Sequence, residues 1–181
     1  MYGVVQIELP IEMPISIPTS AKSLVVKEVH SEWIDKWIAE RHYLGYCPWG
    51  ARLRLAVYHD GQCVGGMLWG RPTAREYDQV RMLELTRMYL DDICPRNSES
   101  RCLALATKII RKKFPEVHTL ISYSDPAYGH TGTIYRAAGW QFDGITKGHP
   151  WNPRNGKPRR NVAIGPKIRW VKRLYNIENG A

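Results

Sequence analysis

The sequence has no apolar run approaching the ~18 residues that a membrane-spanning helix requires, and it begins without a basic-then-apolar leader. We therefore expect a soluble protein of the cytoplasm with no membrane partner. Internal repeats and low-complexity linkers are also missing. Because 44% of the 181 residues are hydrophobic and 10% are aromatic, the chain can bury the core of a single globular domain.

Cysteine is scarce, and its spacing excludes two common uses. None of the four cysteines has the CxxC spacing of zinc and redox sites, and their number is too low for a secreted disulfide scaffold. We expect free thiols in a reducing compartment at Cys47, Cys63, Cys94 and Cys102.

Acidic residues are absent between Gly144 and Asn176, although this segment holds nine of the 26 basic residues. The rest of the chain has 17 basic and 17 acidic residues, so the net charge of +9 comes from this segment alone. Like charges at this density favour a polyanionic partner. A solvated basic tail that aids solubility is the alternative interpretation.

Aromatic residues lie between these basic residues, an arrangement that suits base stacking beside phosphate contacts. Trp170 and Tyr175 are two of them. The partners that this composition favours are double-stranded DNA and, as a second possibility, tRNA. The candidate nucleic-acid contacts are Lys147, Trp151, Arg154, Lys157, Arg159 and Arg160.

The hydrophobic pattern predicts a chain of short alternating elements, hence an α/β (α+β) fold with a mixed central sheet flanked by helices. Asp60-Gly61 is a strong hairpin signal, and Ser31 is a suitable N-cap for the first helix. We expect helices at 31–40, from 97 or 98 to 114, and at 131–138. We expect strands at 4–9, 24–29, 52–58, 63–69, 80–90 and 118–123, and a last strand that starts at 140.

This order of elements resembles that of the GNAT acyltransferase superfamily. The segment TIYRAAGW at 133–140 is similar to the family's fourth-helix motif, in which a tyrosine precedes a glycine by four residues. The resemblance covers residues 24–143. It implies a GNAT-like domain at 1–143, with 144–181 as a basic extension that packs on this domain and contacts nucleic acid.

A more specific resemblance is to the Mom family of phage DNA-modification proteins. Five blocks occur in the same order: RHYLG at 41–45, LTRM at 85–88, PRNSESR at 95–101, SYSDP at 122–126 and GHTGTIY at 129–135. The resemblance implies a DNA-modifying transferase. Such an enzyme would convert adenine in phage DNA to its carbamoylmethyl derivative, which blocks restriction endonucleases, in the cytoplasm of the host cell.

The loop that should bind the acyl donor departs from the GNAT pattern. GNAT enzymes hold the coenzyme A pyrophosphate with a glycine-rich loop at a helix N-terminus. The corresponding loop here contains no glycine, and Glu99 opposes an anion. The donor is therefore either acetyl-CoA or glycyl-tRNA. The candidate donor-binding residues are Arg96, Asn97, Ser98 and Ser100.

The resemblance also implies the catalytic residues. In the GNAT fold the two central strands splay, so Arg87, Ser124 and Asp125 should converge where they separate. Tyr135 would project toward the leaving group as the general acid. The alternative for Tyr135 is a core tyrosine whose hydroxyl is simply hydrogen-bonded.

His42 and Tyr43 follow the first helix and could hold the acceptor base or accept a proton. With Asp125, His42 could also ligate iron, because iron accepts imidazole and carboxylate ligands. A surface or capping histidine is the alternative.

An adenine within a duplex has to leave the base stack to reach a buried site. Aromatic side chains that could stack on the flipped base follow the first helix and the buried strand at 118–123. They are Tyr43, Tyr46, Trp49 and Tyr128. Ordinary packing is the alternative for each.

Two other functions fit parts of the sequence. A conventional GNAT N-acetyltransferase of a small amine or a protein would fit the fold and leave the basic segment unexplained. A noncatalytic nucleic-acid-binding module would explain the basic segment alone. The sequence indicates no oligomeric state.

Overall fold

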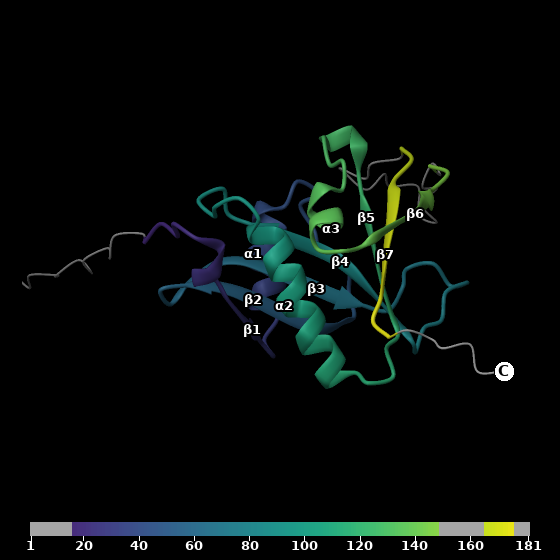
Figure 1. Ribbon diagram of the computed structural model, residues 1–181, viewed down its shortest axis with the longest axis horizontal. Helices are drawn as coiled ribbons and strands as arrows, with labels where there is room; N and C mark the ends of the chain where they lie inside the picture. Colours follow the sequence, from purple (N-terminus) through teal and green to yellow (C-terminus); the bar gives the residue numbers. More distant parts are fainter. Residues whose placement is uncertain (1–15, 149–164, 176–181) are drawn as a thin grey trace, which may run out of the picture.

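The computed structural model describes residues 16–148 and 165–175, and the strand expected at 4–9 lies outside these ranges. Within them the chain forms a seven-stranded sheet in the order β1-β2-β3-β4-β5-β7-β6 (Figure 1). All neighbouring strands are antiparallel except β4 and β5. The strands are β1 (Val25–Glu28), β2 (Ala51–His59), β3 (Gln62–Gly70), β4 (Met82–Leu90), β5 (Thr119–Ser124), β6 (Gln141–Ile145) and β7 (Ile168–Arg173).

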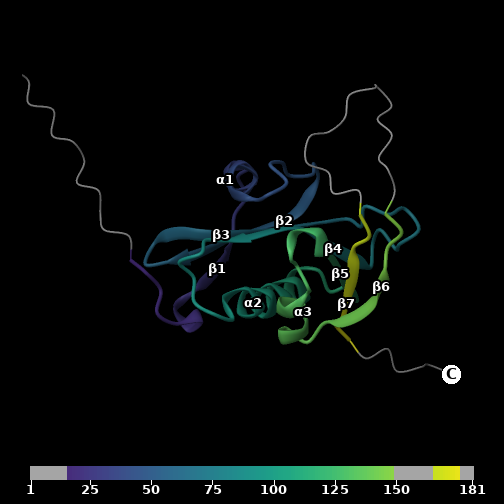
Figure 2. The ribbon, with the colours of Figure 1, turned by 90° about the horizontal axis from the view of Figure 1, so that it is seen from above.

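Helices cover both faces of the sheet. Helix α1 (Trp33–Arg41) lies on one face, and α2 (Ser98–Lys113) and α3 (Thr133–Ala137) lie on the other (Figure 2). Two short 3-10 helices, η1 (Ala21–Ser23) and η2 (Pro126–Tyr128), precede β1 and follow β5. None of the helices in the described ranges is long and apolar enough to cross a membrane.

The start of α1 differs from the prediction by one residue. Glu32, and not Ser31, occupies the N-cap position, and it makes no side-chain cap bond. The Ser31 hydroxyl still accepts a long hydrogen bond of 3.5 Å from the backbone N–H of Trp33. Ser31 therefore satisfies a helix donor from outside the helix.

Helix α1 packs closely on the sheet because β3 carries a glycine beneath it. A Cβ at Gly66 would lie 2.8 Å from Ile38 Cδ1 and 2.9 Å from Ile34 Cδ1. Ile34 and Ile38 are both fully buried and form a small core with Ala56 and Leu68. A side chain at position 66 would therefore separate the helix from the sheet.

The main core lies between the sheet and α2, as the periodicity of α2 predicts. Leu103, Ala106 and Ile110 are fully buried. Leu105 is only half-buried. It stands two positions from Leu103, about 200° around the helix, and so points away from the buried stripe. All four cysteines are free, as predicted.

Among the described strands, β4 and β5 are the only parallel pair, and they separate after three residue pairs. β4 and β5 pair at Met82 with Thr119, Leu83 with Leu120 and Glu84 with Ile121. Both strands continue beyond this point without pairing to each other, β4 to Leu90 and β5 to Ser124. The predicted splay of the two central strands is confirmed, and it opens a gap in the middle of the sheet.

Strand β7 was missed by the sequence analysis, which treated the strand beginning at 140 as the last. β7 lies between β5 and β6 and pairs with both. Its Trp170 is 2% exposed and belongs to the core, so it is not available to stack on a nucleic-acid base. A strand with a buried aromatic residue is difficult to recognise when Lys and Arg occupy half of its six positions, as in β7.

Candidate functional site

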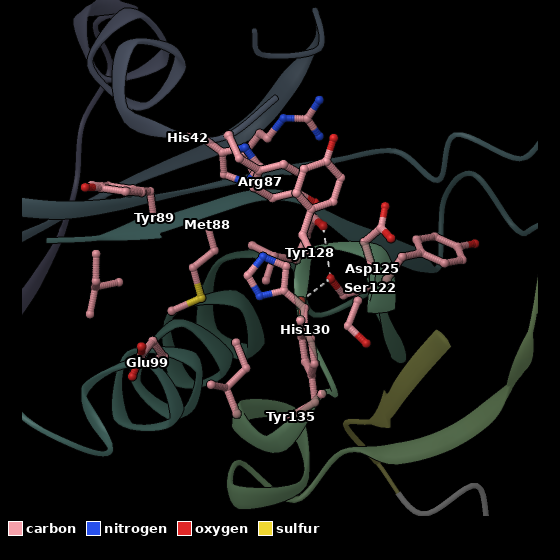
Figure 3. A pocket seen from close by; sticks show the side chains of 18 of the residues that line it. His42, Arg87, Met88, Tyr89, Glu99, Ser122, Asp125, Tyr128, His130 and Tyr135 are labelled. Carbon is pink, nitrogen blue, oxygen red and sulfur yellow. Dashed lines mark hydrogen bonds between the residues drawn. The ribbon is translucent and has the colours of Figure 1, made fainter. Parts of the chain in front are cut away.

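A cavity of about 610 Å³ occupies the gap between the separated ends of β4 and β5. Its volume lies in the range of small-molecule sites. Figure 3 shows His42 and Arg87 on one side of this pocket and Tyr135 on the other, with Asp125 and Ser122 from the β5 side. The structure brings together all six predicted catalytic residues, which line it: His42, Tyr43, Arg87, Ser124, Asp125 and Tyr135.

Tyr135 is buried at the base of the pocket, where α3 presents it to β5. Its hydroxyl lies 2.8 Å from Ser122 Oγ, which donates its own proton to the Leu85 carbonyl at 3.1 Å. Because a serine hydroxyl carries one proton, the bond between the two hydroxyls is donated by Tyr135. Burial raises the pKa of Tyr135 to about 12, against the lowering effect of Ser122. The phenol is therefore a neutral proton donor.

Two tryptophans hold the Tyr135 ring in place. The ring of Trp170 is stacked on it at 5.8 Å and 14°, and the ring of Trp140 meets it edge-on at 5.3 Å. Gly132, at the N-cap of α3, has a φ of +77°, and a Cβ there would lie 2.1 Å from the Trp170 ring. Only glycine fits this position, so the close approach of α3 to β7 fixes where the phenol stands.

Asp125 directly follows β5 and is only 2% exposed. Its Oδ1 accepts a hydrogen bond of 3.0 Å from the Ala127 N–H, which caps η2. Its buried Oδ2 has no hydrogen-bond partner among the described residues. A buried carboxylate oxygen without a partner is costly. Since Asp125 lines the pocket, a ligand that donates a hydrogen bond to Oδ2 would relieve this cost.

The Ser124 side chain is hydrogen-bonded inside the protein on its acceptor side. It is buried, and its Oγ accepts a 2.9 Å hydrogen bond from Trp170 Nε1. The hydroxyl proton is left for the pocket, because Ser124 acts as acceptor in that bond.

His42 stands just after α1 with its tautomer set by the backbone. Its Nδ1 accepts a 3.2 Å hydrogen bond from the Leu44 N–H, so in the neutral ring the proton is on Nε2. Desolvation by burial, followed by the charges of Arg87 and His130, lowers the pKa of His42 to about 4. At neutral pH the imidazole is therefore uncharged and offers an N–H donor through Nε2.

We expect the lowered pKa of His42 to make the protein less stable in mild acid. The unfolded chain binds a proton at this residue near pH 6.5, whereas the folded chain does so only near pH 4. The stability contribution is therefore complete above pH 6.5 and is lost as the pH falls toward 4. Discounted for partial exposure, the loss between pH 7 and pH 5 is about 1 kcal/mol. Urea denaturation at both pH values should show that His42→Gln removes this part of the loss and that the exposed His30→Gln does not.

Aromatic rings from two loops stack at the mouth of the pocket. Tyr43 lies between His42, at a centroid distance of 4.4 Å, and Tyr128, at 4.2 Å. His130 adds a fourth ring 5.3 Å from Tyr43. Tyr43 and Tyr128 are 37% and 44% exposed, so part of the stack remains open to a planar ligand.

Arg87 connects the pocket to the loop that follows α1. Its Nε donates a 2.9 Å hydrogen bond to the Tyr46 carbonyl, and its Nη1 donates to the Thr86 carbonyl. The guanidinium also lies over the Tyr46 ring at 4.7 Å. Tyr46 thus packs against Arg87 and, unlike Tyr43 and Tyr128, does not line the pocket.

The loop predicted to bind the donor lies at the N-terminus of α2. None of its four predicted residues lines the pocket. The Ser98 hydroxyl donates to the Pro95 carbonyl at 2.6 Å, and the Ser100 hydroxyl donates to the Asn97 carbonyl at 3.1 Å.

The residues of this region that do line the pocket are acidic. Arg96 is exposed at its side, whereas Asp92 and Glu99 contribute to the pocket wall. These carboxylates oppose a pyrophosphate and favour a ligand with a cationic group. Among the described residues, Arg41 and Arg87 also line the pocket and carry the opposite charge.

No cluster of three or more His, Cys, Asp or Glu side chains is placed to hold a metal ion within 16–148 and 165–175. His42 has already committed Nδ1 to the backbone, which leaves only Nε2 as a ligand. The described residues therefore do not fit the predicted iron site.

Most of the predicted nucleic-acid contacts lie outside the described residues: Trp151, Arg154, Lys157, Arg159 and Arg160. Lys147 is described and exposed. Two other cations of the basic segment form hydrogen bonds within the domain. Arg169 binds the Asp143 carboxylate at 2.7 Å, and Lys172 donates to the Ala138 carbonyl at 2.7 Å.

Ser122 and His130 are two of the pocket residues that the sequence does not single out. Ser122 stands two positions before Ser124 on β5, so the period of two along a strand places both on the same face. This signal was available in the sequence. His130 follows η2, and nothing in the local pattern distinguishes it from a surface residue before the contact with Tyr43 is known.

Comparison with known proteins gives a family match over most of the chain. The model of the Mom protein family matches residues 23–176. The methylcarbamoylase Mom of Escherichia phage Mu is 34% identical over 131 residues, which are 65% of this chain and 54% of the phage Mu protein. The chain thus matches about half the length of that relative.

Solved structures resemble the fold at low sequence identity. An aminoglycoside acetyltransferase in complex with coenzyme A and kanamycin has a TM-score of 0.59 and 11% identity, with 83% of this chain and 95% of that chain covered. The ribosomal-protein-S5-alanine acetyltransferase of Vibrio fischeri has a TM-score of 0.58 and 14% identity, with 85% and 94% covered. The predicted GNAT-like α/β fold with a mixed sheet is confirmed.

Proposed function

This chain belongs to the Mom protein family, and we propose on that basis that it is a transferase that converts adenine in phage DNA to N6-carbamoylmethyladenine. The observation that carries the proposal is the unpartnered Oδ2 of Asp125 in the pocket between β4 and β5. An exocyclic amine of adenine offers the N–H donor that this oxygen lacks. The modified base would protect the phage DNA from restriction by the host.

The other pocket residues complement an adenine ring. His42 donates through Nε2, which suits an acceptor nitrogen of the purine. The stack formed by Tyr43, Tyr128 and His130 offers aromatic faces to a planar base. His42 therefore binds the base as a hydrogen-bond donor, and Asp125 is the better candidate for the proton acceptor.

Acyl transfer at this site needs a base for the attacking amine and an acid for the leaving group. Asp125 accepts the proton of the exocyclic amine as its nitrogen attacks the donor carbonyl. Tyr135 donates its proton to the leaving group, since a hydroxyl can rotate away from Ser122 toward a stronger acceptor. The high pKa of Tyr135 keeps this proton in place until the leaving group becomes basic.

A glycyl donor accounts for the product by acyl transfer alone. The exocyclic nitrogen N6 forms an amide with the glycyl carbonyl, and the tRNA hydroxyl leaves. The free glycyl amine then attacks purine C6 through a five-membered ring, and the bond from C6 to the original N6 breaks. The original nitrogen becomes the terminal amide, and the glycyl nitrogen remains on the purine.

Two acidic residues of the pocket lining are the structural support for a glycyl donor. Asp92 and Glu99 suit a protonated glycyl amine and oppose a pyrophosphate. The basic segment of the chain suits tRNA as well as DNA. Acetyl-CoA is the second candidate, because structural neighbours such as the aminoglycoside acetyltransferase bind coenzyme A.

Mass spectrometry of nucleosides tests the proposal directly. Plasmid DNA from cells that express the protein should contain an adenine species heavier by one carbamoylmethyl unit. DNA from cells that express Asp125→Ala should lack it. Unmodified DNA in the presence of folded, DNA-binding wild-type protein would favour the noncatalytic binding module, and an acetylated amine elsewhere would favour the conventional acetyltransferase.

Isotopic labelling identifies the donor. With glycine labelled at nitrogen and supplied as glycyl-tRNA in a purified reaction, the label should appear on the nitrogen bonded to purine C6. Label from acetyl-CoA carbon in the side chain, with no label from glycine, would contradict the glycyl route. Loss of activity with an iron chelator under these conditions would do the same.

A further inference from the structure

Trp49 is the most exposed large hydrophobic side chain in the described ranges, with 96% of its surface accessible. It belongs to the loop between α1 and β2 and does not line the pocket. This placement argues against stacking on a base inside the pocket, one of the roles that the sequence suggests for it. A fully exposed indole is the kind of side chain that is buried by a partner.

The loop that carries Trp49 is fixed against the pocket. Arg87, a pocket residue, holds the Tyr46 carbonyl at 2.9 Å. The Cys47 thiol donates to the Asp35 carbonyl at 3.2 Å, which attaches the loop to α1. Trp49 follows Tyr46 by three residues and so lies within about 11 Å of it along the chain. The indole therefore projects from a fixed base beside the pocket.

The far end of the same loop also borders the pocket. The Gly50 carbonyl oxygen lies 3.5 Å from the Cβ position of Gly70, which is 3.7 Å from the side chain of Thr86. Thr86 lines the pocket. One side of the loop thus contacts Arg87 of β4, and the other side lies against Gly70 of β3, next to Thr86.

An exposed cation, Arg71, lies near the end of this loop. Arg71 directly follows Gly70, which is the partner of Ala51 in the pairing of β2 with β3, so Arg71 lies near Gly50. Its side chain is exposed, and within the described part of the chain it forms no ion pair. An exposed indole and an exposed guanidinium on adjoining loops suit the base stack and the phosphate backbone of a nucleic-acid duplex.

We propose that Trp49 is a wedge that enters the base stack of duplex DNA and fills the space left by the adenine as it turns into the pocket. The inference rests on the proposed function, because it requires a duplex whose adenine is the substrate. Apolar side chains inserted between base steps unstack them and lower the cost of base extrusion. Arg71 would bind an adjacent phosphate and so fix the position of the indole relative to the base step that it enters.

The proposed wedge predicts that Trp49→Ala loses modification activity on double-stranded DNA and not on single-stranded DNA. Trp49→Ala should slow modification of a paired adenine by about 10–100-fold, since extrusion costs a few kcal/mol. The same variant should modify the corresponding single strand at a rate within about two-fold of wild type, because no base has to leave a duplex. Trp49→Phe should retain most of the duplex activity, and Trp33→Ala, which removes another exposed tryptophan, should retain it on both substrates.

A binding assay separates the wedge from the chemistry. Permanganate oxidises thymines that are no longer stacked, so wild-type protein should increase the reactivity of the thymine opposite the target adenine and Trp49→Ala should not. If Trp49→Ala lost modification activity equally on duplex and single strand, or lost none on either, the wedge would be overturned. A wild-type protein that exposes this thymine through Trp49 but yields no modified base would overturn the proposed function and support the wedge. A protein that exposes no thymine would overturn the wedge.

Discussion

Replacing Tyr135 by phenylalanine is expected to reduce DNA modification by about 10²–10⁴-fold, the usual contribution of a general acid. The variant keeps the ring and its packing against Trp140 and Trp170. It removes only the hydroxyl, whose proton is directed to Ser122 in the free protein and toward the leaving group in the reaction. The rate should be measured with nucleosides from a purified duplex reaction, in which the modified base is quantified.

The stability of Tyr135→Phe distinguishes a catalytic hydroxyl from a structural one. Loss of the bond to Ser122 should lower the free energy of unfolding by about 1 kcal/mol, which leaves a folded protein at assay temperature. Tyr58→Phe on β2, which is not a pocket residue, serves as the matched control and should keep full activity. If Tyr135→Phe retains activity, the tyrosine is a core residue and its hydroxyl is not the proton donor.

Asp125→Asn is expected to lower activity by about 10²-fold or more and to leave the fold intact or more stable. The amide oxygen can still accept the hydrogen bond from the Ala127 N–H, so η2 keeps its cap. The lost group is the unpartnered, buried Oδ2, which is the proposed proton acceptor. Because a neutral amide costs less to bury than a carboxylate, the free energy of unfolding should stay the same or rise by about 1 kcal/mol.

A lower activity of Asp125→Asn together with an unchanged or higher free energy of unfolding would show that Asp125 acts in the reaction and does not stabilise the fold. Both quantities should be measured on the same preparation, by nucleoside mass spectrometry and by urea denaturation. Asp60→Asn in the hairpin turn is the matched control, because Asp60 is exposed and asparagine tolerates its φ of 45°. A large loss of stability in Asp125→Asn, in proportion to the loss of activity, would make Asp125 a structural residue.

Local signals in the sequence were sufficient for most of the fold. Asp60-Gly61 adopts positive φ at both turn positions and joins β2 to β3 as the hairpin signal requires. The end of α3 is marked by Gly139, which has a φ of +71° one residue after the C-cap. Such features depend on a few adjacent residues, so the sequence determines them before any tertiary contact forms.

The sequence was less informative where tertiary contacts decide the structure. The buried place of Trp170 depends on β5 and β6 approaching from both sides, and the charged residues around it favoured a nucleic-acid segment instead. Arg169 illustrates the same difficulty, because its partner Asp143 lies on another strand. A basic residue that binds phosphate and one that binds a carboxylate of the same protein are identical in the sequence.

The sequence predicted some of the residues of the pocket but not the hydrogen bonds between them. The family resemblance led to six of the residues that line it, and the separation of β4 and β5 explains why they converge. The roles within this set could not be separated without the structure. That His42 accepts from Leu44, and so presents a donor to the pocket, follows only from the 3.2 Å contact to the backbone.

The position of β7 has a consequence for how the protein is made. Among the described residues, all those that line the pocket precede Thr146 in the chain, but Trp170, which supports Ser124 and Tyr135, is translated later. A nascent chain would therefore carry the reactive side chains before the strand that fixes them exists, and pairing between distant segments is slow to form. We expect a ribosome stalled before β7 to display an inert polypeptide, so that catalytic competence arrives only after β7 has been translated.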